Sequence, residues 1–160
     1  MDRIVLLSCS KSKLDHKAPA QELYSASPTF TKTLSYGKSL KPDRIYILSA
    51  KHYLVPLDKE LEPYDLTLKE MSAEQKEQWG DIVIGQMKKL GINPNNTQFI
   101  FLTGQEYMKP LLKFIPQENI QNPLVGKRMG ERMQWLNTQL MKINEILTNI
   151  KRFIHEIISK

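Results

Sequence analysis

Three short apolar segments recur along the first hundred residues of the chain, separated by longer amphipathic stretches. They are Ile4–Leu7, Ile45–Leu48 and Phe99–Leu102, and each is bounded by polar or small residues. Continuous apolar runs of this length are typical of strands buried on both faces, as in a parallel sheet covered by helices. A weaker fourth strand is predicted near Asn119–Gln121.

Helix signals occupy the stretches between these strands. Ser27 is a suitable N-cap before a proline, and the helix that it starts is predicted to reach Leu40. A second helix begins at Ser72, where Gln75 completes a capping box, and ends at Gly91. Helical spacing predicts its buried face, which consists of Trp79, Ile82, Val83, Met87 and Leu90.

A third helix is predicted from Gln105 to Phe114, bent at Pro110. Strands and helices therefore alternate along the chain, and this order is typical of the α/β class. We predict a three-layer α/β/α fold with a short, mostly parallel sheet and a long C-terminal helix.

The last thirty residues carry a heptad pattern. Apolar residues alternate at spacings of four and three, at Met129, Met133, Leu136, Leu140, Ile143, Leu147, Ile150, Ile154 and Ile157. A helix over residues 128–158 would be roughly 45 Å long at 1.5 Å per residue, which exceeds the diameter of about 30 Å expected for a domain of this size. We therefore predict a core domain over residues 1–137 and a helical extension over residues 138–160. The preferred interpretation is a homodimer through this helix, and the alternative is a helix that folds back over its own sheet.

Composition excludes several protein classes. Of the 160 residues, 41% are hydrophobic and 25% are charged, which is typical of a globular domain and not of a disordered chain. No apolar segment is long enough for a membrane span or a signal peptide, so we predict a cytoplasmic protein with no membrane partner. The single cysteine, Cys9, excludes an internal disulfide, and the three histidines lack metal-ligand spacing. We predict no metal site and no cofactor.

The net charge of +6 is unevenly distributed. Residues 1–50 hold 8 basic and 4 acidic side chains, residues 51–104 hold 6 and 8, and residues 105–160 hold 9 and 5. The two ends of the chain thus carry +4 each and the middle carries −2. A basic surface concentrates polyanions and favours a nucleotide or nucleic-acid partner. A protein with ordinary solvated lysines is an equally compatible interpretation.

The loops that follow the predicted strands carry small, polar or reactive side chains. They are Ser8–Lys13, Ser49–His52 and Thr103–Gln105. Because ligands of parallel sheets bind at the carboxyl ends of the strands, we expect these loops to converge on one site. In the first loop, serine hydroxyls, backbone N–H groups and two lysines can bind an anion. It has neither the Walker A nor the Rossmann glycine pattern, and the alternative is an ordinary polar surface loop.

Proton transfer at this edge is assigned to His52 and Asp65. A Cys9 nucleophile with His52 as its base is a weaker hypothesis than a small buried cysteine. Tyr24 and Ser25 are candidate hydroxyl donors, and a tyrosine could stack on a base. The alternatives are a turn aspartate, a packed histidine and partly buried tyrosines. The predicted substrate-binding residues are Ser8, Cys9, Ser10, Lys11, Lys13, Tyr24, Ser25, Ser49, Lys51, Tyr64, Thr103, Gly104 and Tyr107.

Six segments together resemble a bacterial family known only as a domain of unknown function. They are Ser8–Lys13, Pro19–Ser25, Ile47–Leu54, Pro63–Asp65, Thr103–Tyr107 and Pro123–Gly130, and the resemblance covers roughly residues 3–137. Tyr53 stands where that family usually has glycine. The family is distantly similar to the peroxide-stress YaaA proteins and to the core domain of archaeosine synthase, whose α/β cores are similar to uracil-DNA glycosylase. The resemblance implies a nucleotide or nucleobase site at Ser8–Lys13, with Tyr24, Ser25, Ser49 and His52 around it.

Three functions follow from these observations. The first is an enzyme of nucleotide or nucleic-acid modification, acting by glycosidic-bond or base-transfer chemistry. The second is a non-catalytic nucleic-acid-binding stress protein that uses the two basic ends of the chain. The third is a partner-binding module that works through the heptad helix.

Overall fold

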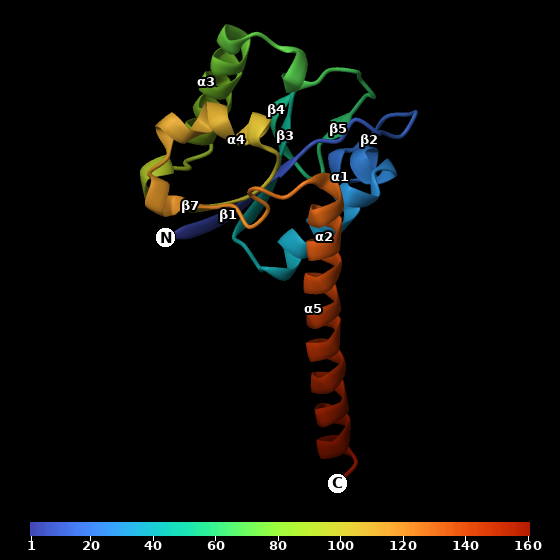
Figure 1. Ribbon diagram of the computed structural model, residues 1–160. Helices are drawn as coiled ribbons and strands as arrows, with labels where there is room; N and C mark the ends of the chain where they lie inside the picture. The colour runs from blue at the N-terminus through green and yellow to red at the C-terminus, as the bar shows by residue number, and fades with distance from the viewer. The chain divides into compact units, whose positions relative to one another are not determined.

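The computed structural model describes residues 1–160, which divide into two compact units, Met1–Gly126 and Lys127–Lys160. A five-stranded sheet in the order β4-β3-β1-β6-β7 forms the centre of the first unit (Figure 1). The strands of this sheet are β1 (Asp2–Ser8), β3 (Arg44–Ser49), β4 (Tyr53–Pro56), β6 (Thr97–Leu102) and β7 (Ile120–Gln121). All neighbours are parallel except β4, which forms an antiparallel edge. The predicted α/β fold with a mostly parallel sheet is confirmed.

Short elements complete the first unit. A separate two-stranded antiparallel sheet pairs β2 (Ala18–Pro19) with β5 (Glu60–Leu61). The α-helices are α1 (Ala20–Leu23), α2 (Pro28–Ser39), α3 (Ala73–Lys89) and α4 (Gln105–Met108). The 3-10 helices are η1 (Tyr24–Ala26), η2 (Leu68–Glu70), η3 (Pro94–Asn96), η4 (Lys109–Phe114) and η5 (Gln117–Asn119).

Strand β1 lies in the middle of the sheet, with β3 on one side and β6 on the other. In the register, Val5 is the partner of both Ile45 and Ile100. The chain first adds β3 and β4 on one side of β1 and then returns to add β6 and β7 on the other. The strand order therefore reverses between β1 and β6, and such a switch point is where open α/β sheets bind ligands.

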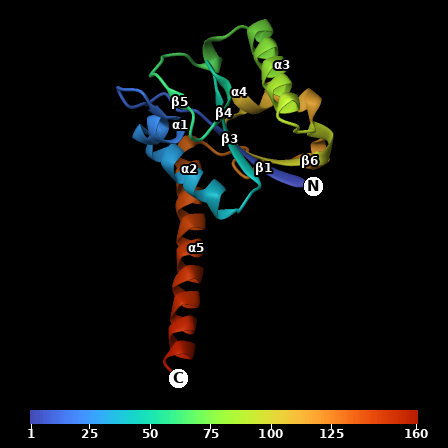
Figure 2. The same ribbon diagram turned by 180° about the vertical axis from the view of Figure 1, so that it is seen from behind.

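Helices cover both faces of the sheet, as the two opposite views show (Figures 1 and 2). Ile4 and Phe99 belong to the buried cluster that α3 joins through Trp79. On the opposite face, a Cβ at Gly37 of α2 would lie 3.1 Å from the side chain of Val5. Alternate residues of β1 thus point to opposite helical layers, as the pleat of a strand requires.

Local signals for helix ends are confirmed. The Ser27 hydroxyl accepts a hydrogen bond from the Phe30 backbone N–H, at 3.3 Å between the two atoms. Ser72 and Gln75 form both hydrogen bonds of a capping box. Gly91 follows the end of α3 with a φ of +76°, the left-handed conformation that glycine adopts without steric cost.

Two helix predictions need correction. Ile82 and Leu90 were expected on the buried face of α3, but they are 44% and 47% exposed. The face is rotated because Gly80 lies directly against the backbone of Pro110, which fixes which side of the helix meets η4. The predicted helix over residues 105–114 also splits after Met108 into α4 and η4. Proline has no N–H for an α-helical bond to the residue four positions earlier, so the α-helix cannot continue through Pro110.

The second unit contains the predicted long helix, α5 (Met129–Ile158). Its thirty residues correspond to a length of about 45 Å. Every residue from Asn144 to Lys160 is exposed. None of the helices of the protein combines the length and the apolar character that a membrane span needs.

The contact between Gly80 and η4 generates a prediction about stability. A Cβ at Gly80 would lie 2.6 Å from the carbonyl oxygen of Pro110, whereas a Cβ at Gly85 of the same helix would meet nothing within 4 Å. We expect Gly80→Ala to lower the free energy of unfolding by about 1–3 kcal/mol through overpacking. Gly85→Ala should raise it by up to about 1 kcal/mol through helix propensity. Urea denaturation of both variants checks this, and equal stability of the two would contradict the assigned contact.

Candidate functional site

The switch point between β1 and β6 is closed by Cys9 and Tyr107. Cys9 directly follows β1, and its backbone N–H donates to the carbonyl oxygen of Leu48 in β3 at 3.0 Å. Its Sγ lies 3.2 Å from the hydroxyl oxygen of Tyr107, which belongs to α4 after β6. The cysteine is therefore linked to strand β3 and to the helix that follows β6.

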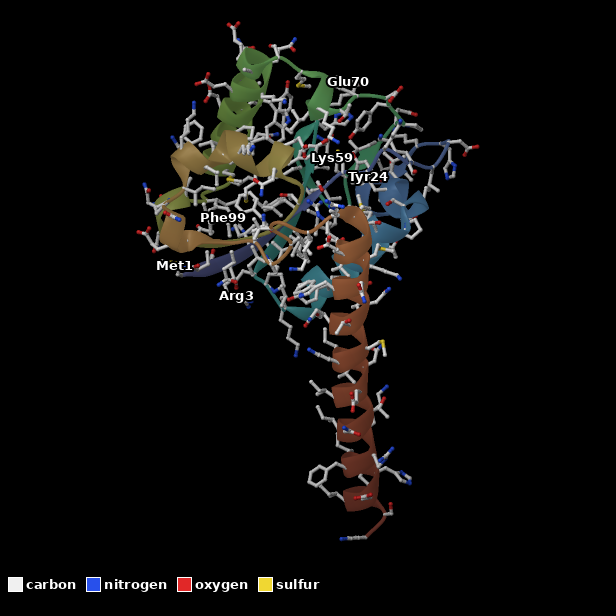
Figure 3. All side chains as sticks on the ribbon, viewed as in Figure 1. Met1, Arg3, Tyr24, Lys59, Glu70 and Phe99 are labelled. Carbon is white, nitrogen blue, oxygen red and sulfur yellow. The ribbon has the colours of Figure 1, made fainter.

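A cluster of hydroxyl groups lies at the same edge. The hydroxyl oxygen of Tyr64 is 2.6 Å from that of Tyr24 and 2.7 Å from Oγ of Ser49. Ser49 ends β3, and its Oγ also accepts the backbone N–H of His52 at 3.0 Å. The Ser49 carbonyl accepts a hydrogen bond from Nε1 of Trp79 at 2.9 Å. Ser49 thus ties the cluster to the turn after β3 and to helix α3. Tyr24, the member of this cluster that Figure 3 labels, comes from η1.

Lys13 covers the ring of Tyr64. Its Nζ lies 4.3 Å from the ring centroid of Tyr64 and 6.0 Å from that of Tyr24, within the range of cation–π interaction. The same ammonium donates to the carbonyl oxygen of Lys11 at 3.2 Å. Burial lowers the pKa of Lys13, and the charges of Cys9 and Asp65 oppose this shift. The Lys13 ammonium is therefore partly desolvated beside the Tyr64 ring.

The three tyrosines of the site remain protonated at neutral pH. Burial raises the pKa of Tyr24 to about 12. Burial also raises the pKa of Tyr64 and of Tyr107, and a negative charge on Cys9 adds to both shifts. These phenols are consequently neutral hydrogen-bonding groups.

His52 packs against the cluster from the turn between β3 and β4. Its ring meets that of Tyr64 edge to face, with centroids 5.3 Å apart. Burial lowers the pKa of His52, and the positive charges of Lys51 and Lys59 lower it further. The imidazole is therefore neutral near pH 7 and able to accept a proton. The Cys9 thiol contacts the hydroxyl of Tyr107, whereas the His52 ring contacts the ring of Tyr64. Cys9 and His52, which the nucleophile hypothesis pairs, therefore contact different side chains.

Tyr53, which follows His52, has a φ of +63°. This conformation is strained for a side chain of its size. At this position the sequence resemblance leads us to expect glycine. Because Tyr53 also packs on the hydrophobic core, its side chain compensates for the backbone strain at this turn.

The loop after Cys9 offers backbone donors. The N–H groups of Ser10–Lys13 make no hydrogen bond within the chain. The hydroxyl of Ser10 donates to the carbonyl oxygen of Ser12 at 2.6 Å, which holds the loop in a turn. Lys11 is exposed beside them. Successive free N–H groups next to lysines form an arrangement suited to anions.

The remaining predicted residues lie at the margin of this cluster. Ser25 is exposed, and its hydroxyl donates to the carbonyl oxygen of Glu22. Thr103 is buried and donates to the Gly104 carbonyl at 3.0 Å. Asp65 is exposed, and Ser8 is the sheet partner of Leu48. The ammonium of Lys51 lies 5.8 Å from the Tyr64 ring centroid. The residues that the structure brings together are Cys9, Lys13, Tyr24, Ser49, Lys51, His52, Tyr64 and Tyr107.

Sequence reasoning missed the role of Trp79. It was assigned to the core on helical spacing, and it is indeed only 2% exposed. Its ring also meets that of Tyr107 edge to face at 5.8 Å, while its N–H holds Ser49. A buried indole needs a hydrogen-bond acceptor, and this requirement was the available signal.

A surface cavity of about 480 Å³ lies elsewhere, between α3 and the α4–η4 segment. Its walls include Lys76, Glu106 and Lys109, and none of the predicted site residues lines it. No group of three or more His, Cys, Asp or Glu side chains is placed to bind a metal ion. The chemistry available at the strand ends is therefore that of hydroxyls, a thiol, an imidazole and lysines.

The burial of Tyr24 generates a pH prediction. Between pH 10 and 12 an unfolded tyrosine loses its proton while folded Tyr24 keeps it, so the unfolded state binds fewer protons and stability falls as pH rises. This residue contributes up to about 1.4 kcal/mol per pH unit in that window. Tyr24→Phe should therefore show a shallower loss of unfolding free energy from pH 10 to 11.5.

Urea denaturation at several pH values measures this slope. The free energy of unfolding at pH 8 is the reference for each protein. For Tyr24→Phe, this value already includes the cost of losing the hydroxyl contact. Equal slopes for the two proteins between pH 10 and 11.5 would contradict the buried state of Tyr24.

Comparison with known proteins gives one match. No curated protein and no solved structure matches the chain. Residues 4–138 match DUF6884, a family of unknown function, and this span includes the loops after β1, β3 and β6. The chain therefore belongs to the DUF6884 family.

Proposed function

We propose that the protein binds a nucleotide or nucleobase at the carboxyl ends of β1, β3 and β6, and that it acts in nucleic-acid modification. The observation that carries this proposal is the convergence of Cys9, Lys13, Tyr24, Tyr64 and Tyr107 on the switch point of the sheet. The resemblance of the motifs to YaaA proteins and to the archaeosine synthase core supports the same class of ligand.

Phosphate would bind at the loop after β1. The free N–H groups of Ser10–Lys13 would donate to its oxygens, and the ammonium groups of Lys11 and Lys13 would supply positive charge. Lys51 and Lys59 add positive charge at the same edge, because the charges of both lower the pKa of the His52 imidazole. An anion approaching this edge would therefore be attracted before it makes contact.

The base would bind beside Tyr64. Lys13 covers that ring in the free protein, at 4.3 Å from Nζ to the centroid. A phosphate in the loop offers the ammonium a stronger partner than the ring does, so Lys13 would turn toward it. This movement exposes the Tyr64 ring for stacking on a base. Binding of phosphate and binding of base are thereby coupled through one side chain.

The reaction we propose is glycosidic-bond or base-transfer chemistry. The neutral imidazole of His52 would accept the proton of the attacking hydroxyl or water as the glycosidic bond breaks, and would return that proton to the departing base. Asp65 is the second candidate for this role. The hydroxyl of Tyr107 would donate to Cys9 and hold its side chain at the switch point of the sheet. We also propose that the protein is cytoplasmic, where an unpaired cysteine stays reduced, and that it forms a homodimer through α5.

The exposed lysines favour a second candidate. Lys11, Lys51 and Lys59 are all exposed and lie at or near the same edge. A non-catalytic nucleic-acid-binding protein would use such a rim without any small-molecule pocket. Its binding would depend steeply on salt, because phosphate contacts release counterions.

A thermal-shift experiment separates the two candidates. We expect one class of nucleotide, nucleoside or free base to raise the melting temperature at moderate salt. A ligand at one hundred times its dissociation constant stabilises the native state by about 2.7 kcal/mol. Lys13→Gln should weaken binding at least tenfold, because both the phosphate contact and the coupled movement are lost.

Lys89→Gln is the matched control, because it removes the same charge from the exposed end of α3. It should leave nucleotide binding unchanged. Shifts from oligonucleotides alone that are abolished by salt would support the second candidate. Such a result would reject the proposed nucleotide site.

A further inference from the structure

The distal part of α5 exposes a continuous apolar stripe. We define the distal stripe as Met141, Ile146, Leu147, Ile150, Phe153, Ile154, Ile157 and Ile158, whose side chains are 48% to 77% exposed. At roughly 100 Å² each, the six of these residues between Ile146 and Ile157 present about 600 Å² of apolar surface, which is the area that each partner buries at the lower end of specific interfaces. Patches of this size on soluble domains mark interaction sites.

The heptad pattern fixes which positions face a partner helix. Leu140, Leu147 and Ile154 occupy a positions, Ile143, Ile150 and Ile157 occupy d positions, and Ile146 and Phe153 occupy g positions. Leucine at a with isoleucine at d disfavours a parallel two-stranded coiled coil and shifts parallel helices toward larger assemblies. In an antiparallel pair each a residue faces a d residue, so every layer combines the two kinds of position. Leu147 would then face the partner's Ile150.

The flanking positions favour the same orientation. In an antiparallel pair g faces g, which places Ile146 against the partner's Phe153 and buries both. In that arrangement e faces e, and Asn144 would lie beside the partner's Lys151 without like-charge repulsion. A parallel pair would instead set Ile146 against the partner's Lys151. Moving the antiparallel register one heptad toward the C-terminus would place Lys151 opposite the partner's Lys151, which is unfavourable.

We propose that two copies of this protein associate through antiparallel pairing of residues 140–157, with the two-fold axis between Leu147 and Ile150. Leu140 then faces the partner's Ile157, and Ile143 faces the partner's Ile154. The two Met129 residues that begin α5 would lie about 60 Å apart at 1.5 Å per residue. The occupant of the stripe is thus a second copy of α5, and this inference is independent of the proposed ligand site.

Light scattering and distance measurement on the full chain test this arrangement. We expect a mass of twice 18.6 kDa at 100 µM protein.

For the distance measurement, spin labels are attached to Glu131→Cys and, separately, Glu145→Cys, each in a Cys9→Ser background. Both glutamates are exposed at f positions, which point away from the seam. In the proposed pair the labels at residue 131 should be about 50 Å apart and those at residue 145 about 20 Å apart. In a parallel pair both distances would be about 20 Å.

A substitution pair supplies the second measurement. Ile150→Glu places a charge in the central layer and should weaken association at least a hundredfold. Asn149→Glu adds the same charge on the outer face of the helix and should leave the mass unchanged. The proposal fails if the natural chain is a monomer at 100 µM, if its mass corresponds to four chains, or if the labels at residue 131 are close together. It also fails if a monomer binds phosphatidylserine vesicles through the stripe.

Discussion

Burial of β1 is the constraint on which the rest of the first unit depends. The strand is paired in parallel on both edges, and Val5, Leu6 and Leu7 are fully buried between two helical layers. Because both neighbours run in the same direction, their carboxyl ends must lie beside Cys9. The chain cannot bury this strand without bringing the loops after β1, β3 and β6 together. The position of the candidate site is a consequence of how the core is built.

The sheet could be predicted where local signals were strong. Four-residue apolar runs identified the strands, and capping residues such as Ser27 and Ser72 identified helix starts, because both depend on neighbours in sequence. Strand β4 was missed because its turn places Tyr53 in the left-handed conformation without the usual glycine. The orientation of α3 was only partly predicted, because it is decided by Pro110, thirty residues away from Gly80.

The site could be predicted as a set of loops but not as a set of contacts. Each loop follows a strand, so parallel strands suffice to bring Cys9, Ser49 and Thr103 to one edge. The hydrogen bonds of Tyr64 with Tyr24 and Ser49 depend on side-chain directions in segments that the sequence separates. The hydrophobic periodicity of the sequence contains no information about these side-chain directions. The same reason explains why the position of Lys13 over an aromatic ring has no sequence signal.

The distribution of charge across the site restricts what it can bind. Lysines lie at the rim, whereas the buried hydroxyls of Tyr24 and Tyr64 hold their protons. An anionic group placed among these neutral phenols would be desolvated, with the Lys13 ammonium over the Tyr64 ring as the nearest positive charge to compensate. The ligand that we propose would therefore keep its anionic part at the lysines and place a neutral, hydrogen-bonding part beside the tyrosines. Nucleotides divide in this way, with phosphate at one end and an uncharged base at the other. Free phosphate or a dianionic sugar would contact only the lysines, and for this reason we propose a base-bearing ligand.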